Sequence, residues 1–186
     1  MLYCCIIHLL LISNIKEELM EAQKKYILNK DSANKKLQRM AYEILENNAD
    51  ETGIILAGIR ESGSVIARNI QKLLKTIGDI PTTLITISLD KKKPDTVTLS
   101  SNEDFTDKVV IVIDDVANSG RTMFYALQPL LKDHPGQVET LALLERTHKQ
   151  FPIELNYVGH SISTTKDEMI VVTVSEGEVG GAYFKS

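Results

Sequence analysis

Short continuous apolar runs alternate along the chain with segments whose apolar residues recur at helical spacing. The first helical segment is predicted for residues 20–47, with Asp31 or Ser32 as its N-cap. A second is predicted for residues 64–78, ending at Gly78, and a third for about 122–132. The apolar faces of the first two helices consist of Leu37, Met40, Ala41, Ile44 and Leu45, and of Val65, Ile66, Ile70, Leu73, Leu74 and Ile77.

The continuous apolar runs predict buried strands. They occupy residues 53–59, 82–89, 109–113, 140–145, 155–162 and 169–174. Runs that are apolar throughout are typical of a parallel sheet covered on both faces. Because strands and helices alternate, the expected fold class is α/β, with a parallel sheet flanked by helices.

Two segments differ from this pattern. The apolar start, MLYCCIIHLLLI, would span only roughly half of a bilayer core as a helix. It also lacks the basic region and cleavage site of a secretory signal, so a signal or anchor is the less favoured interpretation. We therefore expect residues 1–19 to be a leader outside the fold and 20–186 to form one domain. The polar segment 90–107 is long for a loop and is a candidate mobile arm.

Composition limits the classes of function. With 43% hydrophobic and 25% charged residues, the 186-residue chain can bury one core. Its net charge of -4 and pI near 5.6 give no overall electrostatic reason to expect nucleic acid. Cys4 and Cys5 are adjacent and cannot build a disulfide framework or a spaced metal cluster, which favours a reducing, cytoplasmic setting without membrane association.

The stretch VVIVIDDVANSGRT, residues 109–122, carries the clearest chemical signal. Its strand runs into Asp114 and Asp115, where the carboxyl ends of parallel strands face a ligand crevice. The small loop that follows offers backbone amides and hydroxyl groups at the start of a helix, an arrangement that favours a phosphate. Ionised carboxylates beside such a site suit the hydroxyl groups of a sugar. The stretch therefore predicts a sugar-phosphate site.

The same residues also admit plainer interpretations. Paired acids at a strand end also occur in phospho-acceptor pockets and in solvated loops, but Ser119, Gly120 and Thr122 favour the phosphate. The segment RESG alone is more often an ordinary turn. His148 and His160 titrate near neutral pH, yet lone histidines are usually structural, and neither is nominated as catalytic.

The same stretch resembles a known family signature. A hydrophobic run, Asp-Asp, Val, two variable residues, Ser, Gly, a variable residue and Thr is similar to the 5-phosphoribosyl-1-pyrophosphate (PRPP) motif of type I phosphoribosyltransferases. Over about residues 26–184 the chain further resembles the PyrR-type pyrimidine-operon regulators that are also uracil phosphoribosyltransferases. Among the similar segments are GIILAGIRESGSVIARNI and LALLERTHKQFPIELNYVGHSI. The resemblance implies the type I phosphoribosyltransferase fold, with a small hood and a flexible loop.

The resemblance also assigns roles to individual residues. Asp114 and Asp115 would be the catalytic pair that binds the ribose hydroxyls. The 5-phosphate would be held by Ala117, Asn118, Ser119, Gly120, Arg121 and Thr122, and pyrophosphate by Gly58, Ile59, Arg60, Glu61, Ser62 and Gly63. Lys91, Lys92 and Lys93 would act from the flexible loop, and Val158, Gly159, His160, Ser161 and Ile162 would select the nucleobase. Mg²⁺ would arrive bound to PRPP, without dedicated protein ligands for the metal.

The chain departs from the regulators at several positions. Glu61 and Ser62 stand where threonine and arginine are usual, and a carboxylate beside pyrophosphate is electrostatically unfavourable. On the RNA-binding face Arg39 is kept, whereas Gln38 and Tyr42 replace a threonine and a histidine. RNA binding is therefore possible but not favoured.

The expected function is magnesium-dependent transfer of the phosphoribosyl group of PRPP to a nucleobase, with uracil as the first choice and release of pyrophosphate. Two alternatives stay open: a regulator of pyrimidine genes that binds RNA or senses nucleotides with little turnover, and a purine phosphoribosyltransferase. Likeness to the family also implies a homodimer or larger homo-oligomer.

Overall fold

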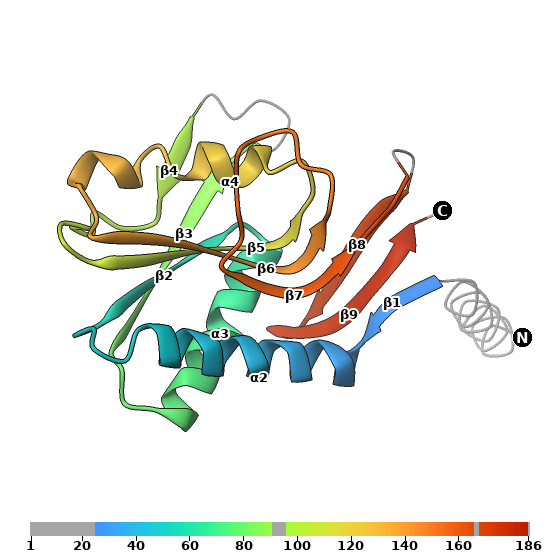
Figure 1. Cartoon of the computed structure of the whole chain (residues 1–186), viewed down its shortest axis with the longest axis horizontal. Coiled ribbons are helices and arrows are strands. Elements are labelled where there is room, and N and C mark those ends of the chain that lie inside the picture. The colour runs from blue at the N-terminus through green and yellow to red at the C-terminus, as the bar shows by residue number, and fades with distance from the viewer. Residues whose placement is uncertain (1–24, 91–95, 166–167, 186) are drawn as a thin grey trace, which may run out of the picture.

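The computed structural model describes residues 25–90, 96–165 and 168–185, which form two sheets and the helices that pack on them (Figure 1). The larger sheet has six strands in the order β4-β3-β2-β5-β6-β7. In that order the strands are Val97–Leu99, Thr82–Leu89, Ile54–Ile59, Val109–Ala117, Gln137–Arg146 and Tyr157–Ile162. All neighbouring pairs are parallel except β3 and β4.

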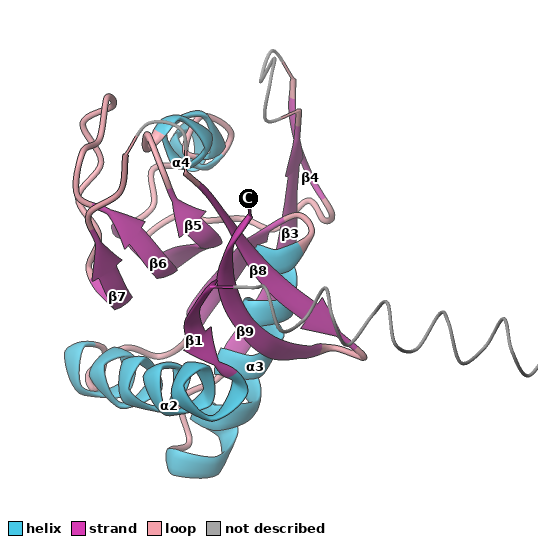
Figure 2. Cartoon of the chain, turned by 90° about the vertical axis from the view of Figure 1, so that its right-hand side faces the viewer, coloured by secondary structure: helices cyan, strands magenta, loops and turns pink. Residues whose placement is uncertain are grey.

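Helices cover both faces of this sheet. α2 (Lys30–Asn47) and α3 (Ser62–Ile77) lie on one face, and α4 (Arg121–Ala126) lies on the other together with a 3-10 turn, η1 (Leu130–Asp133) (Figure 2). Alternate residues of each strand serve the two cores, so that Ile111 packs with the α2–α3 side and Val112 with the α4 side. The predicted α/β class is confirmed.

The smaller sheet forms the hood. Its strand order is β1-β9-β8, and the strands are Lys25–Asn29, Glu178–Lys185 and Met169–Ser175. All pairs in it are antiparallel. The hood is fixed to α3 by Asn69, whose Nδ2 donates to the Gly177 carbonyl at 2.9 Å.

Several boundaries differ from those predicted. Residues 25–29 are a strand instead of the start of the first helix, because Asn29 is the N-cap and accepts a 2.8 Å bond from the Ser32 amide. Asp31 and Ser32, the predicted caps, lie in the first helical turn. The helix predicted for about 122–132 ends at Ala126. Pro129 disfavours helical backbone at the residue before it, and the chain continues through i to i−3 bonds such as Leu130 N to Leu127 O.

Besides β1, two further strands were not predicted, and one is longer than predicted. β9 was missed because Gly180 and Gly181 lower its strand propensity, and β4 because it lies inside the polar segment. β5 continues past Ile113 through both aspartates, because pairing with β6 extends from Asp114 opposite Ala142 to Ala117 opposite Glu145.

Some expectations concern parts of the chain outside the described residues. The leader 1–19 lies there, as do Lys91, Lys92 and Lys93. Within the described ranges, no helix has the length and apolar character needed to span a bilayer.

Candidate active site

A pocket of about 510 Å³ opens at the carboxyl end of β5. One wall is the unbroken stretch 114–123, which contains every residue predicted to bind ribose or the 5-phosphate. The opposite wall comes from Arg146 at the end of β6 and from Glu168, Met169 and Ile170 at the start of β8. The phosphate-loop wall therefore faces residues that are close to it in space but distant in sequence.

The two acids differ in their surroundings. Asp114 is only 2% exposed and accepts a 2.9 Å bond from the Asp115 amide through Oδ1, whereas Asp115 is partly exposed. The ladder with β2 ends at Ile113, directly before the pair, whereas the ladder with β6 continues through Asp114 to Ala117. The acids therefore sit on rigid structure at the ligand edge of the sheet.

The predicted 5-phosphate loop, residues 117–122 and called the phosphate loop below, is fixed by hydrogen bonds to the segment that follows β6. The Ser119 carbonyl accepts two bonds of 3.0 Å, from the amides of Gln150 and Phe151. Gly120 has a φ of 80°, and a Cβ added there would lie 3.3 Å from the Phe151 carbonyl oxygen. Only glycine suits this backbone angle and this approach, so Gly120 allows the loop to turn into α4.

The predicted pyrophosphate loop, residues 58–63, follows β2. Gly58, Ile59 and Gly63 are buried, while Arg60, Glu61 and Ser62 line a shallow pocket with Ser88 and Leu89 of β3. The Arg60 amide donates to the Ile87 carbonyl at 2.9 Å, and the Arg60–Glu61 peptide bond is cis. The structure thus divides the predicted set into three residues that face solvent and three that pack in the fold.

Close packing joins this loop to the acid pair. A Cβ on Gly58 would lie 2.6 Å from the Cα of Ser64, and one on Gly63 would lie 2.5 Å from the Ile113 carbonyl oxygen. Both glycines let the start of α3 approach the ends of β2 and β5. The pyrophosphate loop and the acid pair are therefore neighbours at one edge of the sheet.

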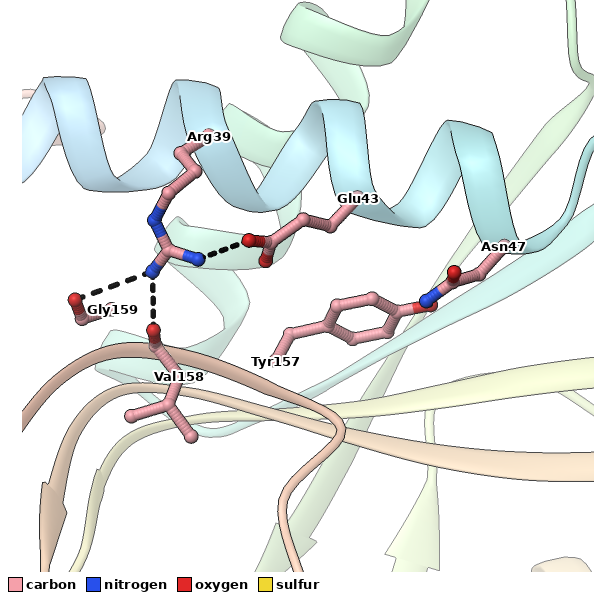
Figure 3. A network of polar contacts seen from close by, with 6 residues as sticks. All are labelled: Arg39, Glu43, Asn47, Tyr157, Val158 and Gly159. Atoms are coloured by element: carbon pink, nitrogen blue, oxygen red, sulfur yellow. Dashed lines mark hydrogen bonds and ion pairs between the residues drawn. The ribbon is translucent and has the colours of Figure 1, made fainter.

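The predicted base-selecting segment, residues 158–162, lies elsewhere. It belongs to β7, the edge strand, and none of its residues lines the pocket of 114–123. The carbonyls of Val158 and Gly159 accept bonds from the Arg39 guanidinium of α2, with the Gly159 bond at 3.4 Å (Figure 3). Ser161 Oγ donates to Glu145 Oε2 at 2.9 Å, and His160 is exposed.

The wall opposite the phosphate loop was missed by sequence reasoning. Arg146 could have been found, because it ends a continuous apolar strand that was expected to lie in the same sheet as the acid pair. Glu168 directly precedes the segment MIVVTV, but the start of a hood strand carries no local signal for a ligand. A bond from the Thr165 amide is the main cause that holds the pKa of Glu168 below its usual value.

Comparison with known proteins decides the family. The model of the phosphoribosyl transferase domain matches residues 24–177, most of the chain. The chain belongs to the type I phosphoribosyltransferase family. The residues matched include both walls of the pocket and the loop that follows β2.

Curated relatives of this phosphoribosyltransferase carry the name "Bifunctional protein PyrR". That of Oceanobacillus iheyensis is 35% identical over 166 residues, which cover 83% of this chain and 92% of the relative. That of Fusobacterium nucleatum is 32% identical over 168 residues, covering 84% and 94%.

Solved structures show the same fold at low identity. The hypoxanthine phosphoribosyltransferase of Trypanosoma cruzi matches with a TM-score of 0.73 and 12% identity, covering 86% of this chain and 95% of that one. The Staphylococcus aureus hypoxanthine phosphoribosyltransferase matches with a TM-score of 0.68 and 17% identity, covering 82% and 84%.

Proposed function

We propose that this phosphoribosyltransferase transfers the phosphoribosyl group of PRPP to uracil and releases pyrophosphate. The observation that carries the proposal is the single pocket in which 114–122 faces residues 168–170 across Arg146. One wall has the chemistry for a sugar phosphate, and the other adds the apolar side chains of Met169 and Ile170.

PRPP would bind against the wall formed by residues 114–123. Asp114 and Asp115 would accept bonds from the ribose hydroxyls, and the loop from Ala117 to Thr122 would hold the 5-phosphate with amides and hydroxyls. As the bond to pyrophosphate breaks, positive charge develops on the ribose ring. The fixed carboxylates would stabilise that charge without reorganising.

The leaving group would be held at the loop after β2. Arg60 is exposed there, and Ser62 offers a hydroxyl beside it. Glu61 lines the same surface, so we expect weaker attraction for pyrophosphate than a neutral residue would give. Lys91, Lys92 and Lys93 would add positive charge from the arm that follows β3.

The site suits magnesium that arrives with PRPP. Among the described residues no group of three or more His, Cys, Asp or Glu side chains could hold a metal. Asp115 is partly exposed at the pocket and is the protein carboxylate we assign to the ion, whose other ligands would be PRPP oxygens and water. When bound, Mg²⁺ would neutralise charge on the leaving pyrophosphate.

We propose to place the base against Met169 and Ile170. Residues 158–162, the sequence-based choice, lie outside the pocket, and two of their carbonyls are engaged by Arg39. Met169 and Ile170 line the pocket with apolar side chains, and β8 is an edge strand of its sheet, so its outer backbone groups would offer donors and acceptors to the edge of uracil. Uracil is preferred to a purine because the curated relatives that cover most of this chain share the PyrR name.

A base panel tests the proposal. The protein would be incubated with PRPP, magnesium and one of uracil, hypoxanthine, guanine, xanthine or adenine, and nucleoside monophosphate would be measured by chromatography. We expect uridine monophosphate. Product from a purine alone would replace uracil by that base, and no product from any base would remove the enzyme proposal.

A second candidate function is gene regulation through RNA binding. It is favoured by the PyrR name of the relatives and by a basic turn after β6 that contains His148 and Lys149. His148 is exposed there, next to Lys149, whose ammonium forms an ion pair with Glu145. Arg39, the cation kept on α2, contacts Glu43 and β7 instead of pointing freely to solvent (Figure 3). We therefore expect weak RNA binding. A gel shift with pyrimidine-operon leader RNA, with and without uridine monophosphate, tests this expectation. A strong shift that depends on the nucleotide would favour the regulatory function instead.

The setting and assembly remain proposals. We propose a cytoplasmic enzyme, since the two adjacent cysteines offer no disulfide framework. We also propose a homodimer or larger homo-oligomer, which light scattering after gel filtration would test.

A further inference from the structure

Arg146 contacts both walls of the pocket. Its Nη1 donates to Asn118 Oδ1 in the phosphate loop at 2.8 Å, and its Nη2 donates to the Glu168 carbonyl at 3.2 Å. Nε and Nη2 also donate to Thr164 Oγ1 and to the Thr165 carbonyl. One guanidinium therefore joins the phosphate loop to the segment that leads into β8.

On the second side, hydrogen bonds join Thr165 to Glu168. Glu168 Oε2 accepts from the Thr165 amide at 2.9 Å and from the Thr165 hydroxyl at 3.2 Å. Met169 and Ile170 follow directly and line the pocket. Arg146 therefore holds both Thr165 and Glu168, the residue that directly precedes Met169.

We propose that Arg146 is a positioning residue that transmits occupation of the phosphate loop to the Met169–Ile170 wall. The inference rests on the proposed function and concerns how its two half-sites cooperate. An anion held by the loop amides fixes the Asn118 side chain, and Asn118 in turn fixes the guanidinium. The planar guanidinium then orders Met169 and Ile170. A base that binds afterwards no longer loses the entropy needed to order these two residues.

Lysine is the informative replacement for this residue. Arg146→Lys keeps the positive charge but cannot donate from a rigid fork to Asn118, Thr165 and Glu168 at once. Arg68→Lys is the matched control, because Arg68 is exposed on α3 and outside the pocket. Both substitutions keep the positive charge. A change in the coupling between the two walls that occurs only in Arg146→Lys would therefore show that the geometry of the guanidinium matters and not its charge.

Two native methionines report on the two walls. Met123 lines the pocket beside the phosphate loop, and Met169 lines it on the opposite side. With ¹³C-methyl methionine, their signals can be assigned by Met123→Leu and Met169→Leu variants. Inorganic phosphate, titrated at constant ionic strength, serves as the probe because it would bind the loop without a base and without turnover.

In the wild-type protein and in Arg68→Lys, we expect both signals to move with the same apparent Kd. In Arg146→Lys, Met123 should still move and Met169 should not. A Met169 signal that follows phosphate in Arg146→Lys, or one that stays still in the wild type while Met123 moves, overturns the inference. A Met123 signal that never moves overturns the phosphate-loop assignment and this link with it.

Kinetics supply a second readout that simple loss of stability would not produce. For the base that supports turnover, Arg146→Lys should raise KM by about fivefold or more, the lower end of typical coupling between sites. The Kd for PRPP measured without any base should change by less than about twofold, since the loop amides and the acid pair are intact and coupling acts only when both sites are occupied. A rise in this Kd as large as the rise in KM for the base would contradict a positioning role. Because the phosphate titration is independent of turnover, a failed base panel would not be mistaken for failure of this inference.

Discussion

Gly63, at the start of α3, lies directly against the backbone of Asp114 at the ligand end of β5. A Cβ added to Gly63 would lie 3.1 Å from the Asp114 Cα and 2.5 Å from the Ile113 carbonyl oxygen. The contact exists because β2 and β5 pair in parallel, with Gly58 opposite Ile113, so that both loops leave the sheet at one edge. It brings the proposed pyrophosphate and ribose sites together.

Gly63→Ala should disturb both sites at once. The added methyl group meets backbone atoms, which cannot rotate away, so α3 must move from β5. We expect a loss of about 1–3 kcal/mol in the free energy of unfolding, typical of overpacking, measured by urea denaturation. Gly53→Ala is the control, because its Cβ would lie 3.3 Å from the nearest atom, the Pro81 carbonyl oxygen. Equal losses in the two variants would contradict the contact.

Replacing both acids should abolish catalysis without unfolding the protein. Asp114→Asn combined with Asp115→Asn keeps the size of both side chains but removes the charge that would stabilise the ribose cation. We expect kcat to fall at least about a hundredfold, the usual effect of removing one electrostatic contact to a transition state. Asp79→Asn, exposed before β3, serves as the control. Wild-type turnover in the double variant would show that the assigned roles are wrong.

Glu61→Thr combined with Ser62→Arg should strengthen binding of PRPP. The change removes a negative charge and adds a positive one where pyrophosphate is proposed to sit. We expect KM for PRPP to fall roughly tenfold at low salt, and less at high salt, since exposed charges are screened. Glu51→Arg changes the net charge by the same amount on a distant exposed residue. If that control lowers KM equally, the effect is general and not local.

Tyr157 should make stability depend on alkaline pH. Burial is the main cause that raises its pKa to about 12 from 10.0, and the neighbouring Glu139 carboxyl group adds to the shift. Above pH 10 the unfolded chain loses this proton while the folded chain keeps it. Unfolding therefore becomes easier as pH rises from 10 to 12, and this contribution is fully present only below pH 10.

Tyr157→Phe should remove that part of the pH dependence. It should also lower stability at neutral pH by about 1–3 kcal/mol, because the 2.9 Å bond from the Tyr157 hydroxyl to Glu139 Oε2 is lost inside the protein. Thermal unfolding between pH 8 and 12 measures both effects. Tyr42→Phe, exposed on α2, is the control. An unchanged slope in Tyr157→Phe would contradict the assignment.

Local pattern was enough to predict the central part of the fold. Continuous apolar runs gave β2, β3 and β5, because strands buried on both faces need apolar residues throughout. The same stretch of β5 marked the phosphate loop, whose residues are adjacent in sequence. β9 was not predicted because it contains Gly180 and Gly181, and glycine has a low strand propensity.

The second wall of the site could not be predicted in the same way. Arg146, Glu168 and Met169 meet the phosphate loop only through the packing of β6 and β8 around it. These residues come together only in the folded protein, and no spacing in the sequence predicts that they do. The segment 158–162 looked suitable because it also ends a strand of the main sheet, but its strand is the edge strand, away from Asp115.

The most direct test of the account is a crystal structure of the protein with PRPP and magnesium. The account predicts the 5-phosphate against the amides of residues 118–122, and the ribose hydroxyls within hydrogen-bond distance of Asp114 or Asp115. PRPP bound at another place, or acids turned inward into buried ion pairs while this pocket holds no ligand, would contradict it.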